Sequence, residues 1–363
     1  MSRLVLCNPN MQIGFEGLLL GLKKVGWSVI LDKKNTPEFA DGVNGKFSRL
    51  SSLTGRNALW MPSYHELEEI CMAHKIRHIH VLGEPTYLST FVCAKLKERG
   101  VIKTLSCRVA QNMKHKLPPP FKCSTKKSVE QLDLIFPVTR FSGQYAENVF
   151  AGVRQVVLPN GIPEPFLEEA GVIKGAAESP RVLFAGSFLK RKGLDDLICV
   201  AKMLECEGVQ FDLVGGSVKE LEKIYQGSLP ANVHISGSVT HAELLRYYRS
   251  STVFALLSKT TNGKDFGIFS RFMPVPSAEQ FGRVVIEAHS QGVPVVAYDT
   301  GGLPDVVFDK EFICPEGDVN CVAEKIREAI SRQGRDAENL ISYGRKFSWM
   351  DIAGQLDNEV DCI

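Results

Sequence analysis

Two glutamates stand eight positions apart in the stretch PSAEQFGRVVIEAHSQGVPVVAYDTGG, residues 276–302. Glu287 interrupts an apolar run, where burying an unpaired carboxylate would cost on the order of several kcal/mol, so a hydrogen-bonding partner is expected. A vicinal diol such as that of a ribose offers two donors to the two carboxylate oxygens. Glu279 precedes the run and can contact the other side of the same ligand. The plainer alternative is that Glu287 pairs with a neighbouring lysine and that Glu279 is solvated.

The residues between the two acids predict a helix N-terminus. The run VVIEA is ended by Gly292 and Pro294, which predicts a helix of about ten residues. Its first turn holds Phe281, Gly282 and Arg283. The unpaired N–H groups of such a turn carry partial positive charge, and Gly282 lets a ligand approach the backbone closely. We therefore expect a phosphate-bearing ligand beside the two acids.

A basic turn predicts a second contact with phosphate. In GSFLKRKG, residues 186–193, the cations Lys190, Arg191 and Lys192 follow the apolar run RVLFA and precede a helix that begins near Leu194. A glycine turn after a parallel strand lies where open α/β sheets bind ligands, and three cations suit a diphosphate. The alternative is a solvated basic turn.

The elements that must position these residues form two series of alternating strands and helices. Five strand candidates lie in the second half: RVLFAGS, VQFDLVGG, VHISGS, STVFALLS and VPVVAYD. In the first half RLVLCN, WSVILDKK, HIHVLGE and TLSCRVA alternate with helical patterns, which indicates parallel sheets with right-handed crossovers. A chain of 363 residues exceeds one ordinary core. We expect an α/β domain at 1–160, a linker rich in proline and glycine at 161–180, a second α/β domain at 181–345 and a closing helix at 346–363.

Composition limits the classes of protein. The net charge of +2 gives no overall attraction to nucleic acid, and 44% hydrophobic with 23% charged residues is typical of a globular enzyme. The ten cysteines are scattered without a Cys-x-x-Cys, so we expect reduced, mostly buried thiols in a cytoplasmic protein. The N-terminus does not resemble a signal peptide, and the sequence contains no apolar run of about 18 residues. Peripheral attachment to a membrane stays open.

Five ordered motifs resemble those of the retaining family 4 glycosyltransferases of GT-B fold. The segment with Glu279, seven intervening residues and Glu287 is similar to the family's Glu-x7-Glu signature. The other four are VVLPNGI, similar to its hinge, FAGSFLKRKG, to its diphosphate grip, HISGSVTHAELLRYY, to its base-binding strand and turn, and FSW, to the start of its closing helix. The match covers residues 156–353 and is weaker in the first half. It implies two Rossmann-like doubly wound domains facing a cleft, with a C-terminal helix crossing back to the first domain.

The resemblance also implies roles for individual residues toward a nucleotide-sugar donor. By similarity Glu287 takes the ribose hydroxyls and Glu279 contacts the transferred sugar. Arg191 and Lys192 neutralise the leaving diphosphate, a role that a metal fills in other enzymes, and the chain has no Asp-x-Asp, so neither a metal nor a cofactor is expected. The remaining implied donor contacts are Phe281, Gly282, Arg283, Ser187, Lys190, Gly237, Val239 and, from the first domain, Gly14.

Departures from the family pattern concern Ser187, where many members have arginine, and Gln111, where many have a catalytic-site histidine. Lys190 or Arg191 is expected to compensate for the first. Gln111 and Lys114 are the candidates on the acceptor side. Lys114 begins KHKLPPPFKCSTKK, residues 114–127, which the prolines keep from being helical through its middle. This segment is either a solvated connection or a basic surface for an anionic acceptor or lipid headgroups.

The expected function is transfer of a sugar, with retention, from a nucleotide-diphosphate sugar, with UDP favoured, to a hydroxyl of a glycan or lipid-linked acceptor in surface polysaccharide or glycolipid synthesis. A small secondary metabolite is the competing acceptor. The loop at residues 258–278 is expected to shape the acceptor cleft or to close over the donor. Two other hypotheses stay open. The protein could be a glycosidase that uses the two carboxylates, or a catalytically inactive protein that only binds a nucleotide sugar.

Overall fold

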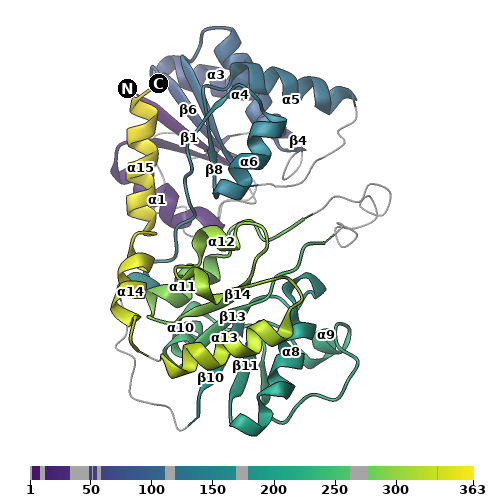
Figure 1. Cartoon of the computed structure of the whole chain (residues 1–363). Helices are drawn as coiled ribbons and strands as arrows, with labels where there is room; N and C mark the ends of the chain where they lie inside the picture. The colour runs from purple at the N-terminus through teal and green to yellow at the C-terminus, as the bar shows by residue number, and fades with distance from the viewer. Residues whose placement is uncertain are drawn as a thin grey trace. The chain divides into compact units, whose positions relative to one another are not determined.

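The computed structural model describes residues 2–8, 13–32, 49–50, 52–54, 59–110, 119–168, 179–261, 277–332 and 334–363. The chain forms two units, Met1–Gly161 together with Trp349–Ile363, and Ile162–Ser348 (Figure 1). Ile162 pairs with Ser348 in a parallel bridge, and its N–H donates to the carbonyl of Phe347 at 3.0 Å. Residues 162–168, which we expected in the linker, therefore contact the second unit.

The first unit is built on a parallel sheet in the order β3-β2-β1-β6-β7-β8-β9. Its strands are β1 (Arg3–Cys7), β2 (Ser28–Asp32), β3 (Arg49–Leu50), β6 (His78–Leu82), β7 (Thr104–Val109), β8 (Leu134–Pro137) and β9 (Arg154–Gln155). All five residues of β6 are buried, as expected for a strand whose sheet is covered on both faces. A small antiparallel pair, β4 (Ser52–Thr54) and β5 (Met61–Pro62), stands apart from it. The predicted strands of the first half are confirmed as β1, β2, β6 and β7.

Helices cover this sheet with two separate apolar clusters. They are α1 (Glu16–Lys24), preceded by the turn η2 (Ile13–Phe15), α3 (Tyr64–Ala73), α4 (Leu88–Glu98), α5 (Pro119–Gln131), α6 (Arg140–Val149) and α15 (Trp349–Asp361). The predicted last helix is confirmed as α15, which packs along α1 (Figure 1). Gly17 makes this approach possible, because a Cβ there would lie 2.2 Å from the Trp349 ring.

Helix α5 corrects one prediction. The proline-rich segment at residues 114–127 was expected not to be helical through its middle, yet α5 begins at Pro119, within the proline run. Proline is tolerated in the first turn of a helix, where its missing N–H would have no intrahelical partner. The Lys122, Lys126 and Lys127 side chains are exposed on this helix.

The second unit has its own parallel sheet in the order β12-β11-β10-β13-β14-β15. Its strands are β10 (Arg181–Ala185), β11 (Gln210–Val214), β12 (Val233–Ser236), β13 (Val253–Leu256), β14 (Val295–Tyr298) and β15 (Ile313–Cys314). The five predicted strands are confirmed. The two-residue β15 was not predicted, because its apolar run is too short to be recognised as a strand. The order turns back at β10 and β13, as in doubly wound folds.

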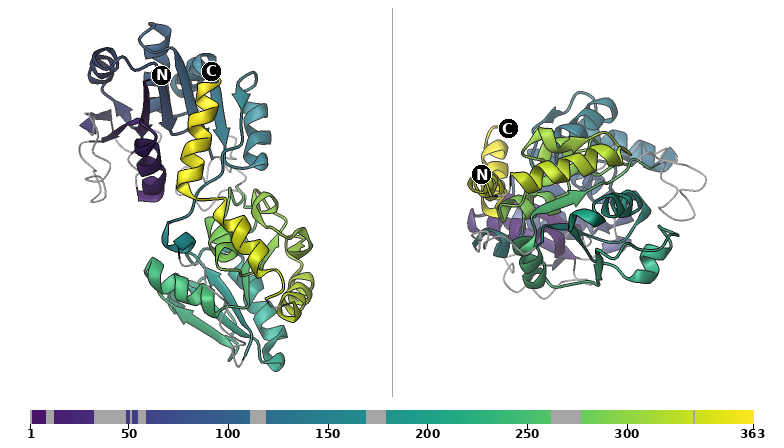
Figure 2. Two further views of the ribbon diagram at one scale, coloured as in Figure 1. Left: turned by 90° about the vertical axis from the view of Figure 1, so that its left-hand side faces the viewer. Right: turned by 60° about the horizontal axis from the view of Figure 1, so that its bottom comes forward.

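Helices lie on both sides of the second sheet (Figure 2). They are α7 (Pro165–Glu168), α8 (Leu194–Met203), α9 (Val218–Glu222), α10 (His241–Ser250), α11 (Arg283–Ser290), α12 (Leu303–Val306), α13 (Val319–Ser331) and α14 (Ala337–Arg345), with short turns η4 (Lys190–Lys192), η5 (Glu205–Glu207) and η7 (Lys310–Phe312). Among the described residues, no helix is both long and apolar enough to cross a membrane.

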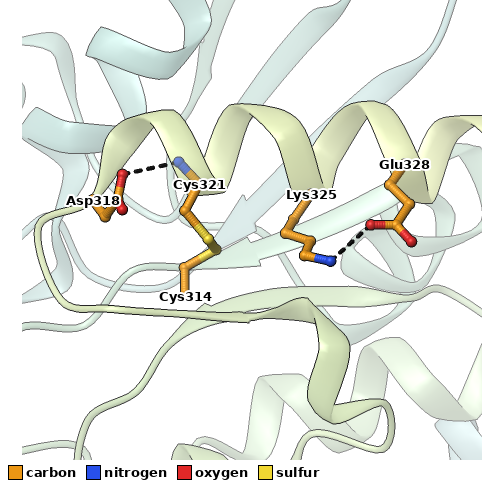
Figure 3. Close-up of a disulfide and its surroundings, with 5 residues drawn as sticks. All are labelled: Cys314, Asp318, Cys321, Lys325 and Glu328. Atoms are coloured by element: carbon orange, nitrogen blue, oxygen red, sulfur yellow. Dashed lines mark hydrogen bonds and ion pairs between the residues drawn. A yellow bond between two sulfur atoms is a disulfide. The ribbon is translucent and has the colours of Figure 1, made fainter.

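Two cysteines correct the expectation of reduced thiols throughout. Cys314, at the end of β15, and Cys321, in the first turn of α13, form a disulfide with their Cα atoms 5.9 Å apart (Figure 3). Asp318 caps α13 by accepting from the Cys321 N–H at 2.9 Å, which fixes the turn that joins the two sulfurs. The two cysteines are seven positions apart and form no Cys-x-x-Cys, so the sequence did not indicate the pair. Of the other cysteines, Cys7, Cys71, Cys93 and Cys107 are buried, and Cys123, Cys199, Cys206 and Cys362 are exposed.

Reduction of this disulfide should lower the free energy of unfolding of the second unit by about 2–3 kcal/mol, because the bond restrains a short loop in the unfolded chain. Urea unfolding followed by far-UV circular dichroism, with and without a dithiol reductant, measures the change. The double variant Cys314→Ser, Cys321→Ser should be insensitive to the reductant. Equal responses of the variant and the native protein would contradict the prediction.

Candidate functional site

The carboxyl ends of the strands in the second unit gather the predicted phosphate and sugar contacts. The turn after β10 carries Arg191 and Lys192, Ser258 follows β13, and Glu279 lies just before α11. Ligands of open parallel sheets bind at this edge. The structure brings these four side chains together, although Lys192 and Glu279 are 87 residues apart in the chain.

One oxygen of Glu279 accepts two hydrogen bonds and lies near a second cationic group. The Lys192 Nζ lies 2.5 Å from Oε2, the Ser258 hydroxyl donates to the same atom at 2.9 Å, and the Arg191 guanidinium lies 3.9 Å away. The other oxygen, Oε1, makes no hydrogen bond to any residue that the structure describes. It is therefore available to a ligand hydroxyl while Oε2 is held.

The environment keeps Glu279 ionised. Burial by itself would raise the pKa of Glu279, but the charge and hydrogen bond of Lys192, the hydroxyl of Ser258 and the charge of Arg191 together lower it below its ordinary value. A carboxylate of this kind can accept hydrogen bonds or stabilise positive charge near neutral pH, but it holds no proton to donate.

Two glycines make this arrangement possible. Gly193, with φ of 68°, lies so close to β13 that a Cβ would come 2.0 Å from the Leu257 carbonyl oxygen. Gly301, with φ of 56°, would place a Cβ 2.1 Å from the Glu279 carbonyl oxygen, which accepts from the Gly302 N–H at 2.8 Å. Larger residues would push the basic turn away from β13 and Glu279 away from the turn after β14.

Glu287 is held differently, inside α11. Its side chain lies among buried residues, and the residue is only 8% exposed. The Tyr248 hydroxyl, from α10, donates to Oε2 at 3.0 Å, and Oε1 has no hydrogen bond from the described part of the chain. Burial raises the pKa of Glu287, against the lowering effects of Arg283, the Tyr248 hydrogen bond and His241. The plainer alternative, a neighbouring lysine as the partner of Glu287, does not describe this carboxylate, whose hydrogen bond within the described part of the chain comes from Tyr248.

The N-terminus of α11 differs from its prediction. The helix has eight residues, Arg283–Ser290, so Phe281 and Gly282 precede it and do not form its first turn. Gly282 has φ of 77° and a Cβ there would lie 2.9 Å from Leu303 Cδ2, which explains why the position needs glycine. Phe281 is buried and packs edge-on against Phe347 at 6.1 Å between ring centroids. A left-handed glycine at the cap shortens the helix because it cannot continue the helical backbone.

The turns after β10, β11 and β12 lie against one another. The Gly215 N–H contacts the carbonyls of Ser236 and Gly237 at 3.0 and 3.1 Å, and Gly186 N–H donates to Val214 O at 2.9 Å. A Cβ on Gly237 would meet nothing within 4 Å, so the space above this turn is open, in keeping with the predicted base contact. Ser187 and Lys190 are exposed on the same edge, and Val239 is half-buried in the following turn.

The remaining predicted residues lie outside the part of the second unit that the structure describes. Gly14 belongs to the first unit, in η2. Gln111, Lys114 and residues 262–276 of the predicted loop lie outside the described residues. The ends of that loop are joined, since Thr261 and Ser277 exchange two backbone hydrogen bonds of 2.8 Å.

Three residues that shape this site were not identified from the sequence: Ser258, Tyr248 and Gly301. Ser258 could have been found, because it ends a predicted strand at the ligand-binding edge. Tyr248 and Gly301 had no such signal, since their roles depend on contacts with Glu287 and Glu279 from elsewhere in the chain.

A separate cavity of about 270 Å³ opens at the amino end of β14. His289, Phe308, Asp309 and Arg332 are among its lining residues. It contains none of the residues of the cluster and lies at the edge of the sheet opposite to the one where ligands of this fold class bind. The Arg332 guanidinium is already paired with Glu311 at 3.1 Å. The carboxyl edge is therefore the candidate functional site.

Part of the chain is similar to known proteins. Residues 169–347 match the model of the family described as glycosyl transferases group 1. An uncharacterized glycosyltransferase of Methanocaldococcus jannaschii is 28% identical over 236 residues, covering 63% of this chain and 58% of that protein. A phosphatidyl-myo-inositol mannosyltransferase of Mycobacterium leprae is 27% identical over 215 residues, covering 56% and 53%. The chain thus spans just over half the length of both curated relatives.

The fold has close counterparts among solved structures. The Anabaena protein HepE in complex with UDP superposes with a TM-score of 0.70 over 100% of both chains, at 17% identity. At that identity the likeness shows the fold alone, which is the predicted GT-B fold with its two Rossmann-like α/β units. The family match spans the turn after β10, Glu279 and Glu287, so the segment of this chain that is similar to the glycosyl transferases group 1 is the one that holds the cluster.

Proposed function

We propose that the protein is a retaining glycosyltransferase that moves a sugar from a nucleotide-diphosphate sugar, UDP-linked by preference, to an acceptor hydroxyl. The observation that carries the proposal is the partly buried Lys192–Glu279–Ser258 cluster at the carboxyl edge of a parallel sheet, with Glu287 in the adjoining helix. The solved structure of HepE, which holds UDP, supports the choice of nucleotide. A glycosidase would have no use for the cations beside Glu279, and the family match also disfavours it.

In the proposed complex Glu287 accepts from the ribose hydroxyls through Oε1, and Glu279 Oε1 accepts from a hydroxyl of the transferred sugar. Lys192 and Arg191 face the diphosphate, with Ser187, Lys190 and the backbone of residues 281–283 completing the donor contacts. These cations stabilise the charge of the leaving group, so the proposal needs neither a metal nor another cofactor. Gly237 and Val239 face the base.

The proposed reaction keeps the incoming and leaving groups on one face of the sugar. The bond from the anomeric carbon to the phosphate oxygen breaks through an oxocarbenium-like state, and the acceptor oxygen bonds to that carbon from the same side. The acceptor proton passes to the departing phosphate oxygen, giving the nucleoside diphosphate. The ionised Glu279 stabilises the positive charge of the sugar and provides no proton.

The acceptor in this proposal is a glycan or a lipid-linked glycan of surface polysaccharide or glycolipid synthesis. The name of the M. leprae relative, a mannosyltransferase acting on phosphatidyl-myo-inositol, supports a membrane-borne acceptor. The exposed Lys122, Lys126 and Lys127 of α5 suit peripheral contact with anionic headgroups. A cytoplasmic enzyme at the inner face of the membrane belongs to the same proposal.

A thermal-shift panel of UDP, GDP, ADP and their sugars tests donor binding. A ligand at about 100 times its Kd adds about 2.7 kcal/mol, and a UDP-sugar should raise the melting temperature by roughly 5–10 °C. Glu287→Ala should remove most of this shift, because the ribose hydroxyls lose their acceptor. The exposed Glu222 of α9 provides the control Glu222→Ala, which should keep the shift. An unchanged shift in Glu287→Ala would take Glu287 away from the ribose, and no shift with any nucleotide would refute the proposed function.

A further inference from the structure

We infer that Tyr248 is a positioning residue that holds the Glu287 carboxylate in place for the nucleotide ribose. The inference rests on the function proposed above and adds a residue to it. Tyr248 lies on α10, 39 positions before Glu287, and is completely buried. Its hydroxyl donates to Glu287 Oε2 at 3.0 Å, which leaves Oε1 for a ligand.

The surroundings of Tyr248 fix its ring. Phe166 of α7 packs edge-on against it at 5.9 Å between ring centroids, and Phe254 of β13 lies at 5.6 Å on a tilted plane. Phe166 is itself held in place, because its backbone carbonyl accepts a hydrogen bond from the Gln291 side-chain amide at 2.8 Å. Packing against two other rings restricts the rotamers of the Tyr248 side chain. Its hydroxyl is therefore held at a defined position against α11.

The hydroxyl has two acceptors within reach and one proton. Besides Glu287, the carbonyl oxygen of Val284 lies 3.3 Å from it. When Glu287 is ionised, Tyr248 donates to the carboxylate, since a charge-assisted hydrogen bond is stronger than one to a neutral carbonyl. When Glu287 is protonated, its own O–H can donate to Tyr248, which then donates to Val284. The tyrosine thus keeps the carboxyl side chain in one orientation in both protonation states.

The charged and titratable groups that face Glu287 are few among the described residues. Arg283 comes from its own helix, and Tyr248 and His241 come from α10. The hydrogen bond from Tyr248 is one of the effects that lower the pKa of Glu287 against its burial. Removing the hydroxyl should therefore raise that pKa and reduce the ionised fraction that can accept from a diol.

The test compares nucleotide binding by Tyr248→Phe and the native protein, using calorimetry with UDP, GDP and ADP and with dideoxy counterparts that lack both ribose hydroxyls. For the nucleotide that the native protein binds, Tyr248→Phe should weaken affinity by about tenfold to a hundredfold, the effect of losing a hydrogen bond to a charged group. Affinity for the dideoxy counterpart should be unchanged. The pH at which the diol-dependent part of the affinity develops should move upward in the variant.

Three further variants complete the design. Tyr343→Phe is the matched control, because it also removes one tyrosine hydroxyl. Tyr343 lies on α14, and its hydroxyl donates to the Val306 carbonyl at 3.2 Å, not to Glu287. Glu287→Gln should lose the same diol-dependent affinity, and adding Tyr248→Phe to it should cost nothing more. If Tyr248→Phe does not fold, Phe166→Leu loosens the ring while keeping the hydroxyl, and should likewise weaken only the diol-containing nucleotide.

The outcomes separate this inference from the function beneath it. Equal losses for a nucleotide and its dideoxy counterpart, or no loss and no shift of the pH profile in Tyr248→Phe, would overturn the positioning role while donor binding stands. Failure of the native protein to bind any of the nucleotides would overturn both. Selective loss in Tyr248→Phe that is absent from Tyr343→Phe supports the inference.

Discussion

Lys192→Met is expected to lower kcat for sugar transfer by about a hundredfold to a thousandfold, the usual effect of removing one group that stabilises charge in a transition state. The Lys192 side chain is only 13% exposed, so its charge acts where water screens little. Its loss also leaves the partly buried Glu279 without its nearest cation, which raises the pKa of that carboxyl. The KM for the donor should change less than kcat, because the leaving-group charge grows as the bond breaks.

Initial rates with a UDP-sugar and a lipid-linked acceptor, read as released UDP, measure this effect. Lys202→Met is the control, since Lys202 is an exposed lysine in the last turn of α8. Thermal melting of both variants checks that they are folded. A Lys192→Met enzyme with native kcat would show that the cation does not act on the leaving group.

Acidification should destabilise the protein strongly, because three histidines are buried in neutral form. Burial lowers the pKa of His78 to about 3, helped by the charges of Arg3 and Lys97. It also lowers the pKa of His289 to about 4 and that of His80 well below its ordinary value. Their ring nitrogens are used: His78 and His80 both bond to the Ser106 hydroxyl, at 3.0 and 2.9 Å.

The protein loses stability at low pH because its unfolded chain takes up protons that the folded protein does not bind. Below an ordinary pKa of 6.5 the unfolded chain protonates these rings while the folded protein does not. Stability is therefore complete above about pH 6.5 and falls as the pH drops toward the folded pKa values, by about 1.4 kcal/mol per pH unit for each histidine. Between about pH 6.5 and 5 the two histidines of β6 should together cost the first unit roughly 4 kcal/mol.

Urea unfolding at several pH values, followed by tryptophan fluorescence, measures the first unit, since Trp27, Trp60 and Trp349 all belong to it. His78→Gln should make the dependence on pH shallower by about one proton. His65→Gln is the control, because that side chain is 88% exposed. A slope that His78→Gln leaves unchanged would show that His78 does not remain neutral in the folded protein.

The role of His78 and His80 also bears on an alternative raised by their spacing. Alternation on one strand, without a third ligand nearby in sequence, favours ordinary strand residues over a metal pair. In the structure the two rings line up with Thr104 and Ser106 of the neighbouring strand, and Trp27 packs edge-on against both. Hydroxyl partners from β7 account for three of their ring nitrogens.

The amino-acid sequence by itself determined the strand series, the ligand-binding edge and the acids and cations that face it. These features are local: an apolar run such as RVLFA predicts a strand, and the Gly-rich basic turn after it falls at a strand's carboxyl end whatever the rest of the chain does. The tertiary structure decided which of these residues meet. Lys192 lies against Glu279, and Tyr248 against Glu287, only because crossovers bring β10, β13 and the helices beside them together.

Local rules also failed where backbone geometry depends on neighbours. Gly282 lies before α11 and not within it, because its φ of 77° is left-handed and cannot continue the helix. Cys314 and Cys321 pair because α13 begins one turn after β15. Patterns along a chain record which residues prefer strand, helix or turn, whereas contacts between distant segments depend on how those elements pack, and that packing decided the hydrogen bonds of both carboxylates.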